Sequence, residues 1–243
     1  MSVPAQGGEE LAAATALALA CQRLHARGLL AGAEGNLSVR LQNGDLLVTP
    51  SGFDKGTVQA SQMLRLHADG ALCHEGTTAC ANSDGNSGDC TGRPSSELQM
   101  HVACYAARPD VRAVVHAHPP VATGFATAGR TLPANVLPEV PVVVGPIALV
   151  PYGRPGTPAL AAAMAPFLDG HEVFLLANHG VTAVGISLAD ALQRMESVEQ
   201  AARILFVAQS LGGANTLDDA EATALMAMSP TARRTTNART ERA

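Results

Sequence analysis

The sequence predicts one domain of mixed α/β structure. Two stretches rich in strong helix formers lie near the ends of the chain, at residues 9–27 and from Ser187 to about residue 211. Between them lie short apolar segments bounded by turn-forming residues, as expected for strands. The 243 residues contain no internal repeat and no evident linker, and this length can bury a sizeable core.

The first half of the chain is predicted to be a helix followed by short strands. Alternating polar and apolar side chains mark the strands, and Asn-Gly or Asp-Gly pairs mark the turns between them. The elements expected here are a helix over 9–27 that Gly28 ends, strands over 37–41 and 46–49 joined by a turn at 43–45, and a strand pair over 61–72 around Asp69-Gly70.

Capping residues and apolar runs predict the elements of the second half. A serine N-cap at Ser95-Ser96, beside the acidic Glu97, is typical of a helix start. The elements expected here are a helix over 98–105 ended by Pro109-Asp110, a strand over 114–118, a strand over 142–150 broken at Gly145-Pro146, a short helix over 158–168, a buried strand over 172–177 and a long helix capped by Ser187.

Polar, small-residue segments are expected to lie outside the core. We expect a domain over 9–211, with a flexible N-terminus at 1–8 and a polar, mobile C-terminal tail at 212–243. Residues 73–92 are rich in turn formers and are interpreted as an exposed loop insertion. Its three cysteines have spacings that match no zinc-ribbon pattern, so they are interpreted as incidental thiols: Cys73, Cys80 and Cys90.

The composition excludes several classes of function. A net charge of −5, with scattered basic residues, gives no electrostatic footprint for nucleic acid. No segment approaches the roughly 20 apolar residues that span a bilayer. The N-terminal apolar run lacks a basic region before it, so a signal peptide is not expected and the predicted location is the cytoplasm.

Two histidines spaced one residue apart are the strongest functional signal. Because side chains on a strand repeat every two residues, His116 and His118 are expected to point to one face, close enough to share a cation. Neutral imidazole is the commonest side-chain metal ligand. In isolation the spacing could arise by chance among the eight histidines of the chain.

A third histidine and a glutamate strengthen this interpretation. His179 follows a buried apolar run and precedes Gly180, where a strand end can deliver a side chain into a cleft. The alternative is a turn histidine that bonds only to backbone. Glu97 lies in the first turn of the predicted helix, where a carboxylate also stabilises the helix dipole without any chemistry.

Three turns could bind an anion such as a phosphate. Ser95 and Ser96 lie beside free amides at a helix start, which is a ready anion site. The Gly35-Asn36 and Ser51-Gly52 turns offer further amides and small polar side chains that could converge on the same anion. The sequence has no P-loop and no dinucleotide fingerprint, so nucleotide binding is not indicated.

Five motifs in order resemble those of the class II aldolase/adducin family. They are GNLS at 35–38, TPSG at 49–52, RPSSE at 93–97, VVHAHPP at 114–120 and NHG at 178–180. The resemblance covers about residues 9–211 and is nearest to the L-fuculose-phosphate aldolase type. It implies an α/β fold with three layers, α/β/α, around a central, mostly antiparallel sheet, and assembly as a homotetramer.

The resemblance also assigns roles to individual residues. It implies that His116, His118 and His179 bind a divalent metal, usually zinc. Glu97 would be the catalytic acid/base and can also ligate the metal when substrate is absent. The substrate phosphate would be held by Asn36, Ser51, Gly52, Ser95 and Ser96. The implied reaction is retro-aldol cleavage of a ketose 1-phosphate, of the L-fuculose or 5-deoxypentulose type, to dihydroxyacetone phosphate and an aldehyde.

Alternatives on the same scaffold stay open. They are a pentulose-phosphate 4-epimerase, a methylthioribulose-1-phosphate dehydratase and a non-catalytic adducin-like interaction module. The tyrosine that the fuculose type uses after the metal strand is missing, because only Tyr105 and Tyr152 occur in the chain. Glu196 and Glu199 could support a metal histidine, although ordinary helix carboxylates are the simpler interpretation.

Overall fold

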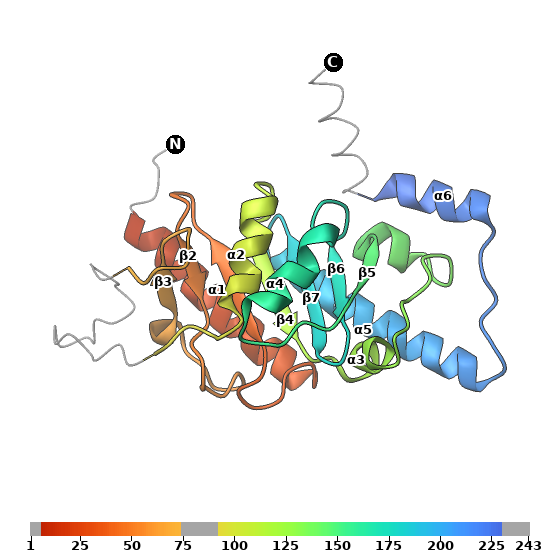
Figure 1. The fold of residues 1–243 in the computed structure, drawn as a ribbon, viewed down its shortest axis with the longest axis horizontal. Helices are drawn as coiled ribbons and strands as arrows, with labels where there is room; N and C mark the ends of the chain where they lie inside the picture. Colours follow the sequence, from red (N-terminus) through yellow and green to blue (C-terminus); the bar gives the residue numbers. More distant parts are fainter. Residues whose placement is uncertain (1–5, 74–91, 230–243) are drawn as a thin grey trace, which may run out of the picture.

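The chain folds around one sheet, seen in a computed structural model that describes residues 6–73 and 92–229 (Figure 1). In the described residues the sheet has seven strands in the order β3-β2-β1-β4-β7-β6-β5. Neighbouring strands are antiparallel except for β5 and β6. The strands are β1 (Asn36–Arg40), β2 (Leu46–Val48), β3 (Leu64–Leu66), β4 (Ala113–Ala117), β5 (Ile147–Val150), β6 (Val173–Leu176) and β7 (Gly180–Gly185).

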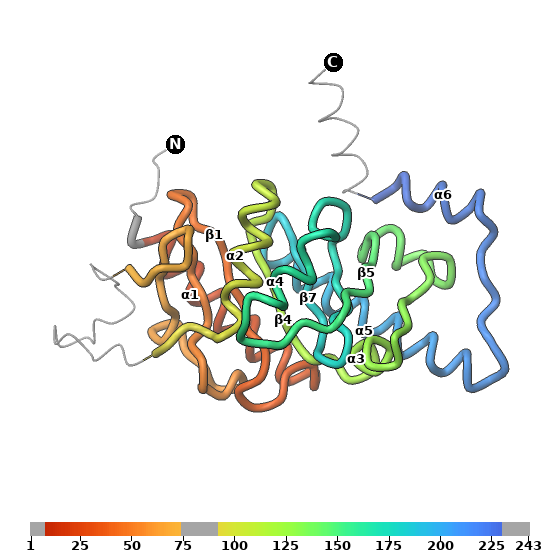
Figure 2. The backbone as a smooth tube through the Cα atoms, viewed as in Figure 1, coloured from red at the N-terminus to blue at the C-terminus, as the bar shows by residue number. Residues whose placement is uncertain are grey.

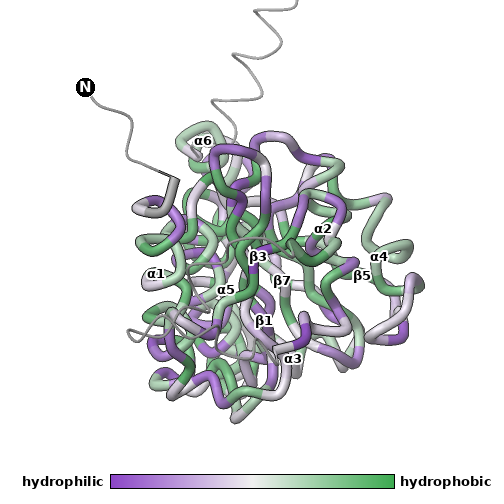
Figure 3. Tube along the Cα trace, turned by 90° about the vertical axis from the view of Figure 1, so that its left-hand side faces the viewer, coloured by the Kyte–Doolittle hydropathy of each residue, from purple (hydrophilic) through white to green (hydrophobic). Residues whose placement is uncertain are grey.

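Helices cover both faces of the sheet. The α-helices are α1 (Gln6–Ala26), α2 (Leu98–Ala107), α3 (Pro120–Thr127), α4 (Pro158–Met164), α5 (Leu188–Ser210) and α6 (Asp219–Met228). Shorter helical turns are η1 (Ala60–Gln62), η3 (Val140–Val144) and η4 (Ala165–Phe167). Seen from the side, the strands lie between α1 and α5 on one side and α2 and α4 on the other (Figure 3).

Each face of the sheet has its own hydrophobic core, because successive side chains of a strand point to opposite faces. Leu37, Val115 and Val181 pack with buried side chains of α1, α3 and α5. Val114 and Val184 pack on the opposite face with side chains of α2 and α4. The predicted three-layer α/β/α architecture with a mostly antiparallel sheet is therefore confirmed.

The strand register places the polar residues of the sheet in one row. Asn36 of β1 is paired with His116 of β4, which is paired in turn with Thr182 of β7. All three side chains lie on the α2 face, because their neighbours Leu37, Val115 and Val181 lie on the other. This row across the centre of the sheet is the foundation of the site described below.

Several predicted elements match the structure closely. Helix α1 covers the predicted 9–27 region, and its start at Gln6 brings residues 6–8 into the helix. The hairpin at 43–45 joins β1 to β2, and Ser187 caps α5 through a bond from Asp190 N to its side chain. The 61–72 region forms β3 and a short bridge between Leu66 and Leu72.

Other predictions were wrong or incomplete. The valine-rich segment 140–144 is a helical turn and not a strand, because the amide of Gly145 bonds back to the carbonyl of Val140 and the turn packs on α5. Strand β7 and helix α3 were not predicted. Within the expected tail 212–243, residues Asp219–Met228 form helix α6, capped by Asp218 and reached by the segment that follows α5 (Figure 2).

Two sequence-based expectations lie largely outside the described residues. The loop insertion at 73–92, with Cys80 and Cys90, falls on residues 74–91, and the end of the C-terminal tail falls on 230–243. Among the helices that are described, none combines the length and apolar character needed to cross a membrane.

Candidate metal centre and active site

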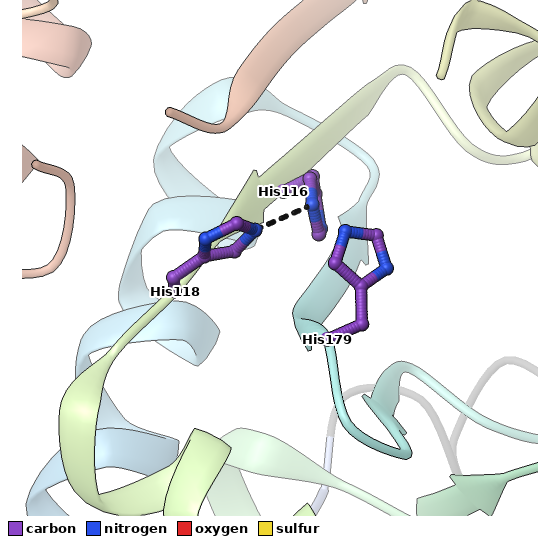
Figure 4. Close-up of side chains that lie close together, drawn as sticks. All are labelled: His116, His118 and His179. Atoms are coloured by element: carbon purple, nitrogen blue, oxygen red, sulfur yellow. Dashed lines mark hydrogen bonds between the residues drawn. The ribbon is translucent and has the colours of Figure 1, made fainter. Parts of the chain in front are cut away.

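The two histidines of the HxH motif lie together, as the strand period predicts. His116 is the fourth residue of β4 and is fully buried, whereas His118 lies just past the end of that strand. Their Nε2 atoms are 3.3 Å apart (Figure 4). Both rings therefore direct the same type of nitrogen into a common space.

His179 reaches this space from the turn between β6 and β7. Asn178 has a φ of 55°, in the left-handed region that few residues other than glycine adopt, and this sharp turn carries His179 back over the sheet. The ring centroid of His179 lies 4.8 Å from that of His116 and 5.2 Å from that of His118 (Figure 4). The histidines predicted from the strand spacing and from the strand-end turn therefore form one cluster.

The close approach of the two segments requires glycine at 180. A Cβ atom on Gly180 would lie 2.5 Å from Cδ2 of His118 and 2.7 Å from the carbonyl oxygen of Ala117. Both distances are far below van der Waals contact. Gly180 therefore lets β7 approach the end of β4 closely enough for the three rings to meet.

Hydrogen bonds on the far side of two rings fix their orientation. Nδ1 of His116 lies 3.0 Å from the carbonyl oxygen of Val181, and Nδ1 of His118 lies 3.2 Å from Oε2 of Glu34. A carbonyl or carboxylate oxygen can only accept, so both Nδ1 atoms donate in this arrangement. The Nε2 atoms are left with free lone pairs, which is the tautomer that binds metal.

Glu97 closes the cluster from the turn before α2. Its Oε1 lies 2.8 Å from Nε2 of His179, and its Oε2 lies 3.3 Å from Nε2 of His116. Burial opposes ionisation of this carboxyl. Hydrogen bonds from His179 and Asn36, with the electrostatic influence of the His116 and His179 rings, outweigh burial, so the pKa of Glu97 lies well below its ordinary value.

The donor set fits a divalent metal ion. One ligand atom from each of His116, His118 and His179 lies within 4.8 Å of the others, and burial lowers the pKa of His116 to about 3, which keeps that imidazole neutral. The Nε2 atom of His179 faces the cluster, 2.8 Å from Oε1 of Glu97, whereas its buried Nδ1 atom lies on the other side of the ring (Figure 4). Three imidazole ligands that leave a further position open are one arrangement found in catalytic zinc sites.

The expected phosphate ligands are brought together in part. Nδ2 of Asn36 lies 3.0 Å from Oγ of Ser95, and the amide of Ser51 donates to the carbonyl of Arg93, which brings the 51–52 turn beside the 93–95 segment. Gly52 has a φ of 79°, which a side chain would strain. Ser96 instead lies against Gly156, whose added Cβ would be 3.2 Å from Ser96 Oγ.

A buried lysine that sequence reasoning missed ties the phosphate-type turns together. Lys55 is 1% exposed, and its Nζ lies 3.0 Å from the carbonyl oxygen of Phe53 and 3.3 Å from that of Ala33. Burial lowers its pKa. The one available signal is composition, because Lys55 is the only lysine in the chain.

The second and third residues that sequence reasoning missed are Ser38 and His101. Both are buried below Asn36, where His101 Nδ1 lies 2.7 Å from Oγ of Ser38. Position alone offers a signal for them: Ser38 follows Asn36 by two residues on β1, and His101 follows Glu97 by one helical turn. Each therefore shares a face with a residue of the site.

Two carboxylates considered as supports for the metal histidines have other partners. Glu196 pairs with Arg23 at 2.6 Å and with Arg27 at 3.3 Å. Glu199 accepts hydrogen bonds from the amides of Val121 and Ala122 at the start of α3. Glu196 thus joins α1 to α5 and Glu199 caps α3, in keeping with the simpler interpretation of both as helix carboxylates.

The chain belongs to the class II aldolase and adducin family. The family model described as "Class II Aldolase and Adducin N-terminal domain" matches residues 15–206, which confirms the resemblance drawn from the five motifs. Two curated relatives of the chain bear names of reactions on phosphorylated compounds.

The first relative is 3-oxo-tetronate 4-phosphate decarboxylase of Escherichia coli (strain K12), which is 36% identical over 185 residues, covering 74% of this chain and 80% of the relative. The second is 5-methylthioribulose-1-phosphate/5-deoxyribulose-1-phosphate aldolase of Rhodospirillum rubrum, which is 32% identical over 195 residues, covering 80% of each chain. The chain is therefore similar both to a decarboxylase and to an aldolase.

Two solved structures are also similar to this chain. YgbL of Escherichia coli, described as a candidate aldolase/epimerase/decarboxylase, has a TM-score of 0.76 at 29% identity, covering 89% of this chain and 99% of YgbL. An L-fuculose 1-phosphate aldolase has a TM-score of 0.75 at 29% identity, covering 88% of this chain and 94% of the aldolase. The fold and the chain's membership of this family are thereby established.

Proposed function

We propose that this protein is a divalent-metal-dependent decarboxylase of a 3-oxo-tetronate 4-phosphate, releasing carbon dioxide and dihydroxyacetone phosphate. The observation that carries the proposal is the cluster of His116, His118, His179 and Glu97 in a chain without the tyrosine that this aldolase type uses to transfer the hydroxyl proton. The similarity to the Escherichia coli decarboxylase supports the choice of substrate.

The chemistry begins with the β-keto acid. Breaking the bond between C1 and C2 releases carbon dioxide, and the electron pair left on C2 delocalises onto the oxygen of C3 as an enediolate. Protonation of C2 then gives dihydroxyacetone phosphate, so one carboxylate and one proton become one carbon dioxide and one ketone. When bound to the three histidines, a divalent cation supplies positive charge beside the oxygen on which the negative charge develops.

Phosphate binding and proton transfer are assigned to residues of the chain. Asn36, Ser95 and the Ser51-Gly52 turn are proposed to hold the phosphate, which orients the substrate away from the reacting bond. Glu97 lies between two of the histidines and is proposed to carry the proton to C2. Its contact with Asn36 Nδ2 at 2.8 Å joins the two parts of the site.

The leaving group favours decarboxylation over aldol cleavage. An aldol cleavage requires proton removal from a hydroxyl group, and the reverse step requires its protonation, for which this aldolase type uses tyrosine. Tyr105 is buried and hydrogen-bonded to Ser38, and Tyr152 is 59% exposed at the end of β5. Loss of carbon dioxide needs no such group, because the departing fragment leaves without a proton.

Cleavage of a ketose 1-phosphate is the second candidate. It passes through the same enediolate of dihydroxyacetone phosphate, so the metal centre, Glu97 and the phosphate turns serve either reaction. The similarity to the Rhodospirillum rubrum aldolase favours 5-deoxypentulose phosphates within this class. The two reactions differ in the fragment that leaves and in the hydroxyl proton that only the aldol cleavage must remove.

One assay separates these candidates. The substrates supplied in turn are 3-oxo-tetronate 4-phosphates, 5-deoxyribulose 1-phosphate and L-fuculose 1-phosphate. Dihydroxyacetone phosphate is measured by the NADH consumed when a coupling dehydrogenase reduces it. We expect fastest turnover with a 3-oxo-tetronate 4-phosphate, accompanied by one carbon dioxide per product. Product formed only from ketose 1-phosphates would identify an aldolase instead, and no product from any of them would favour the adducin-like role.

Zinc and a homotetramer complete the proposal. The donor set of three imidazoles suits zinc. Exposed apolar side chains on α1 and α5 are consistent with burial between subunits: Leu11, Leu19, Phe206 and Val207. Elemental analysis of the purified protein tests the metal, and light scattering after gel filtration tests the assembly.

A further inference from the structure

The amide of Asn36 lies between the active site and a buried polar chain. Its Nδ2 atom faces Oε2 of Glu97 at 2.8 Å and Oγ of Ser95 at 3.0 Å. Its Oδ1 atom faces Nε2 of His101. An amide can be turned by 180° with little change in shape, so whatever bonds to Oδ1 determines which group Asn36 presents to the site.

With the Asn36 amide oriented as in the structure, each hydrogen bond behind it takes one direction. An amide oxygen cannot donate, so Nε2 of His101 must carry the proton. Burial lowers the pKa of His101 to about 4, so the ring is neutral and its Nδ1 atom is an acceptor. Oγ of Ser38 lies 2.7 Å from that Nδ1 and must therefore donate to it.

Tyr105 completes the chain at its far end. Its hydroxyl lies 2.8 Å from Oγ of Ser38. Because Ser38 has already donated its proton to His101, it accepts the proton of Tyr105. Each link thus fixes the next: Tyr105 donates to Ser38, Ser38 to His101, His101 to Asn36, and Asn36 to Glu97.

Water does not replace any link, because all four residues are buried. Ser38 is 0% exposed, His101 2%, Tyr105 4% and Asn36 5%. Buried polar groups are costly unless they are hydrogen-bonded, and apolar side chains would fill the same space without that cost. These four hydrogen-bonded residues are therefore expected to have a role that apolar side chains could not fill.

We propose that His101 is a positioning residue, which, with Ser38 and Tyr105 behind it, holds the Asn36 amide so that its NH₂ group faces Glu97 and the phosphate turns. Turned the other way, Oδ1 of Asn36 would oppose Oε2 of Glu97 and any bound phosphate, all of which are acceptors. The inference rests on the proposed roles of Asn36 and Glu97, which it deepens.

The direct test is the tautomer of His101. Nitrogen-15 NMR of the metal-loaded full chain, with His101 assigned by comparison with His101→Gln, distinguishes a protonated Nε2 from a protonated Nδ1. We expect the Nε2–H form, unchanged from pH 6 to 8. A protonated Nδ1 would overturn the proposal, and this result depends neither on turnover nor on any variant that fails to fold.

Kinetics separate a positioning role from a merely structural one. His101→Leu removes the donor to Asn36, and we expect kcat/KM to fall about 10- to 100-fold, as for misplaced active-site groups, with metal content unchanged. His101→Gln keeps a donor near the Nε2 position and should restore most of the loss. The matched control, Met164→Ala, removes buried side-chain atoms of α4 that take no part in these hydrogen bonds, and it should lower thermal stability with less than a threefold effect on kcat/KM.

The outcomes are distinguishable from failure of the proposed function. If the wild type turns over none of the three substrates, the function fails, and the affinity for inorganic phosphate replaces kcat/KM as the readout for the same variants. If His101→Leu and Met164→Ala lose stability to the same extent and neither changes kcat/KM or phosphate affinity, the buried hydrogen bonds are only structural and the proposal is wrong.

Discussion

Glu97 is the residue on which the proposed chemistry depends most directly. Glu97→Gln keeps the shape of the side chain and removes the proton carrier, so we expect turnover to fall about 10²- to 10⁴-fold. The three histidines are untouched, so the metal should remain near the wild-type stoichiometry. Single-turnover kinetics and elemental analysis check both statements, and a fully active variant would show that the proton moves by another route.

Buried histidines make the metal-free protein sensitive to acid. Burial lowers the pKa of His101 from 6.5 to about 4, so below about pH 6.5 the unfolded chain takes up a proton that the folded chain refuses. Stability is therefore complete above about pH 6.5 and decreases as the pH falls toward 4. His101 alone should cost roughly 2 kcal/mol between pH 7 and pH 5.

Urea unfolding of the metal-free protein at pH 7 and pH 5 measures this loss. His116, whose pKa burial lowers to about 3, adds to the total in the wild type. The contribution of His101 is isolated by His101→Gln, which has no titrating ring and should lose correspondingly less stability over the same range. An equal loss in both proteins would contradict the assignment of the effect to His101.

At the scale of elements, the turn between β6 and β7 holds the third histidine in place. Gly180→Ala would place Cβ 2.5 Å from His118 Cδ2, so β7 or the His118 ring must move. We expect metal affinity to fall at least tenfold, measured by competition with a chromogenic chelator. Gly170→Ala is the matched control, because an added Cβ there meets nothing within 4 Å; equal affinities would show that the turn adapts.

The loop at 50–55 and the loop at 33–35 are joined by one buried cation. Lys55→Met keeps the length of the side chain and leaves the carbonyl oxygens of Ala33 and Phe53 without their donor. We expect KM for the phosphate substrate to rise more than kcat falls, with about 1–3 kcal/mol of lost stability. A change confined to stability would show that the two loops keep their positions without the lysine.

At the scale of the whole molecule, the metal should stabilise the fold as well as the reaction. Its ligands come from β4, the segment after it and the β6–β7 turn, which unfolding would separate, so binding favours the folded state. Removing metal with a chelator should lower Tm and abolish turnover, and added zinc should restore both. Equal Tm values with and without chelator would contradict the proposed metal centre.

The sequence predicted the site more completely than the surrounding structure. The HxH spacing depends only on strand geometry, and the pairing of His116 with His118 follows directly from it. His179 and Glu97 reach the same point because of the strand order of the sheet and the position at which α2 begins. The family resemblance predicted that these two side chains meet, whereas the residue pattern alone did not. The strand predicted from valines 142–144 was wrong, because the packing of this segment on α5 outweighs the strand propensity of valine.

The burial of Lys55 has a practical consequence for the folded chain. It is the only lysine in the sequence and is 1% exposed, so amine-reactive reagents should reach the α-amino group but not this side chain while the fold persists. Unfolding would expose a single new amine and a single cleavage site for a lysine-specific protease. Labelling or cleavage at Lys55, measured by mass spectrometry, therefore reports global unfolding without an engineered probe.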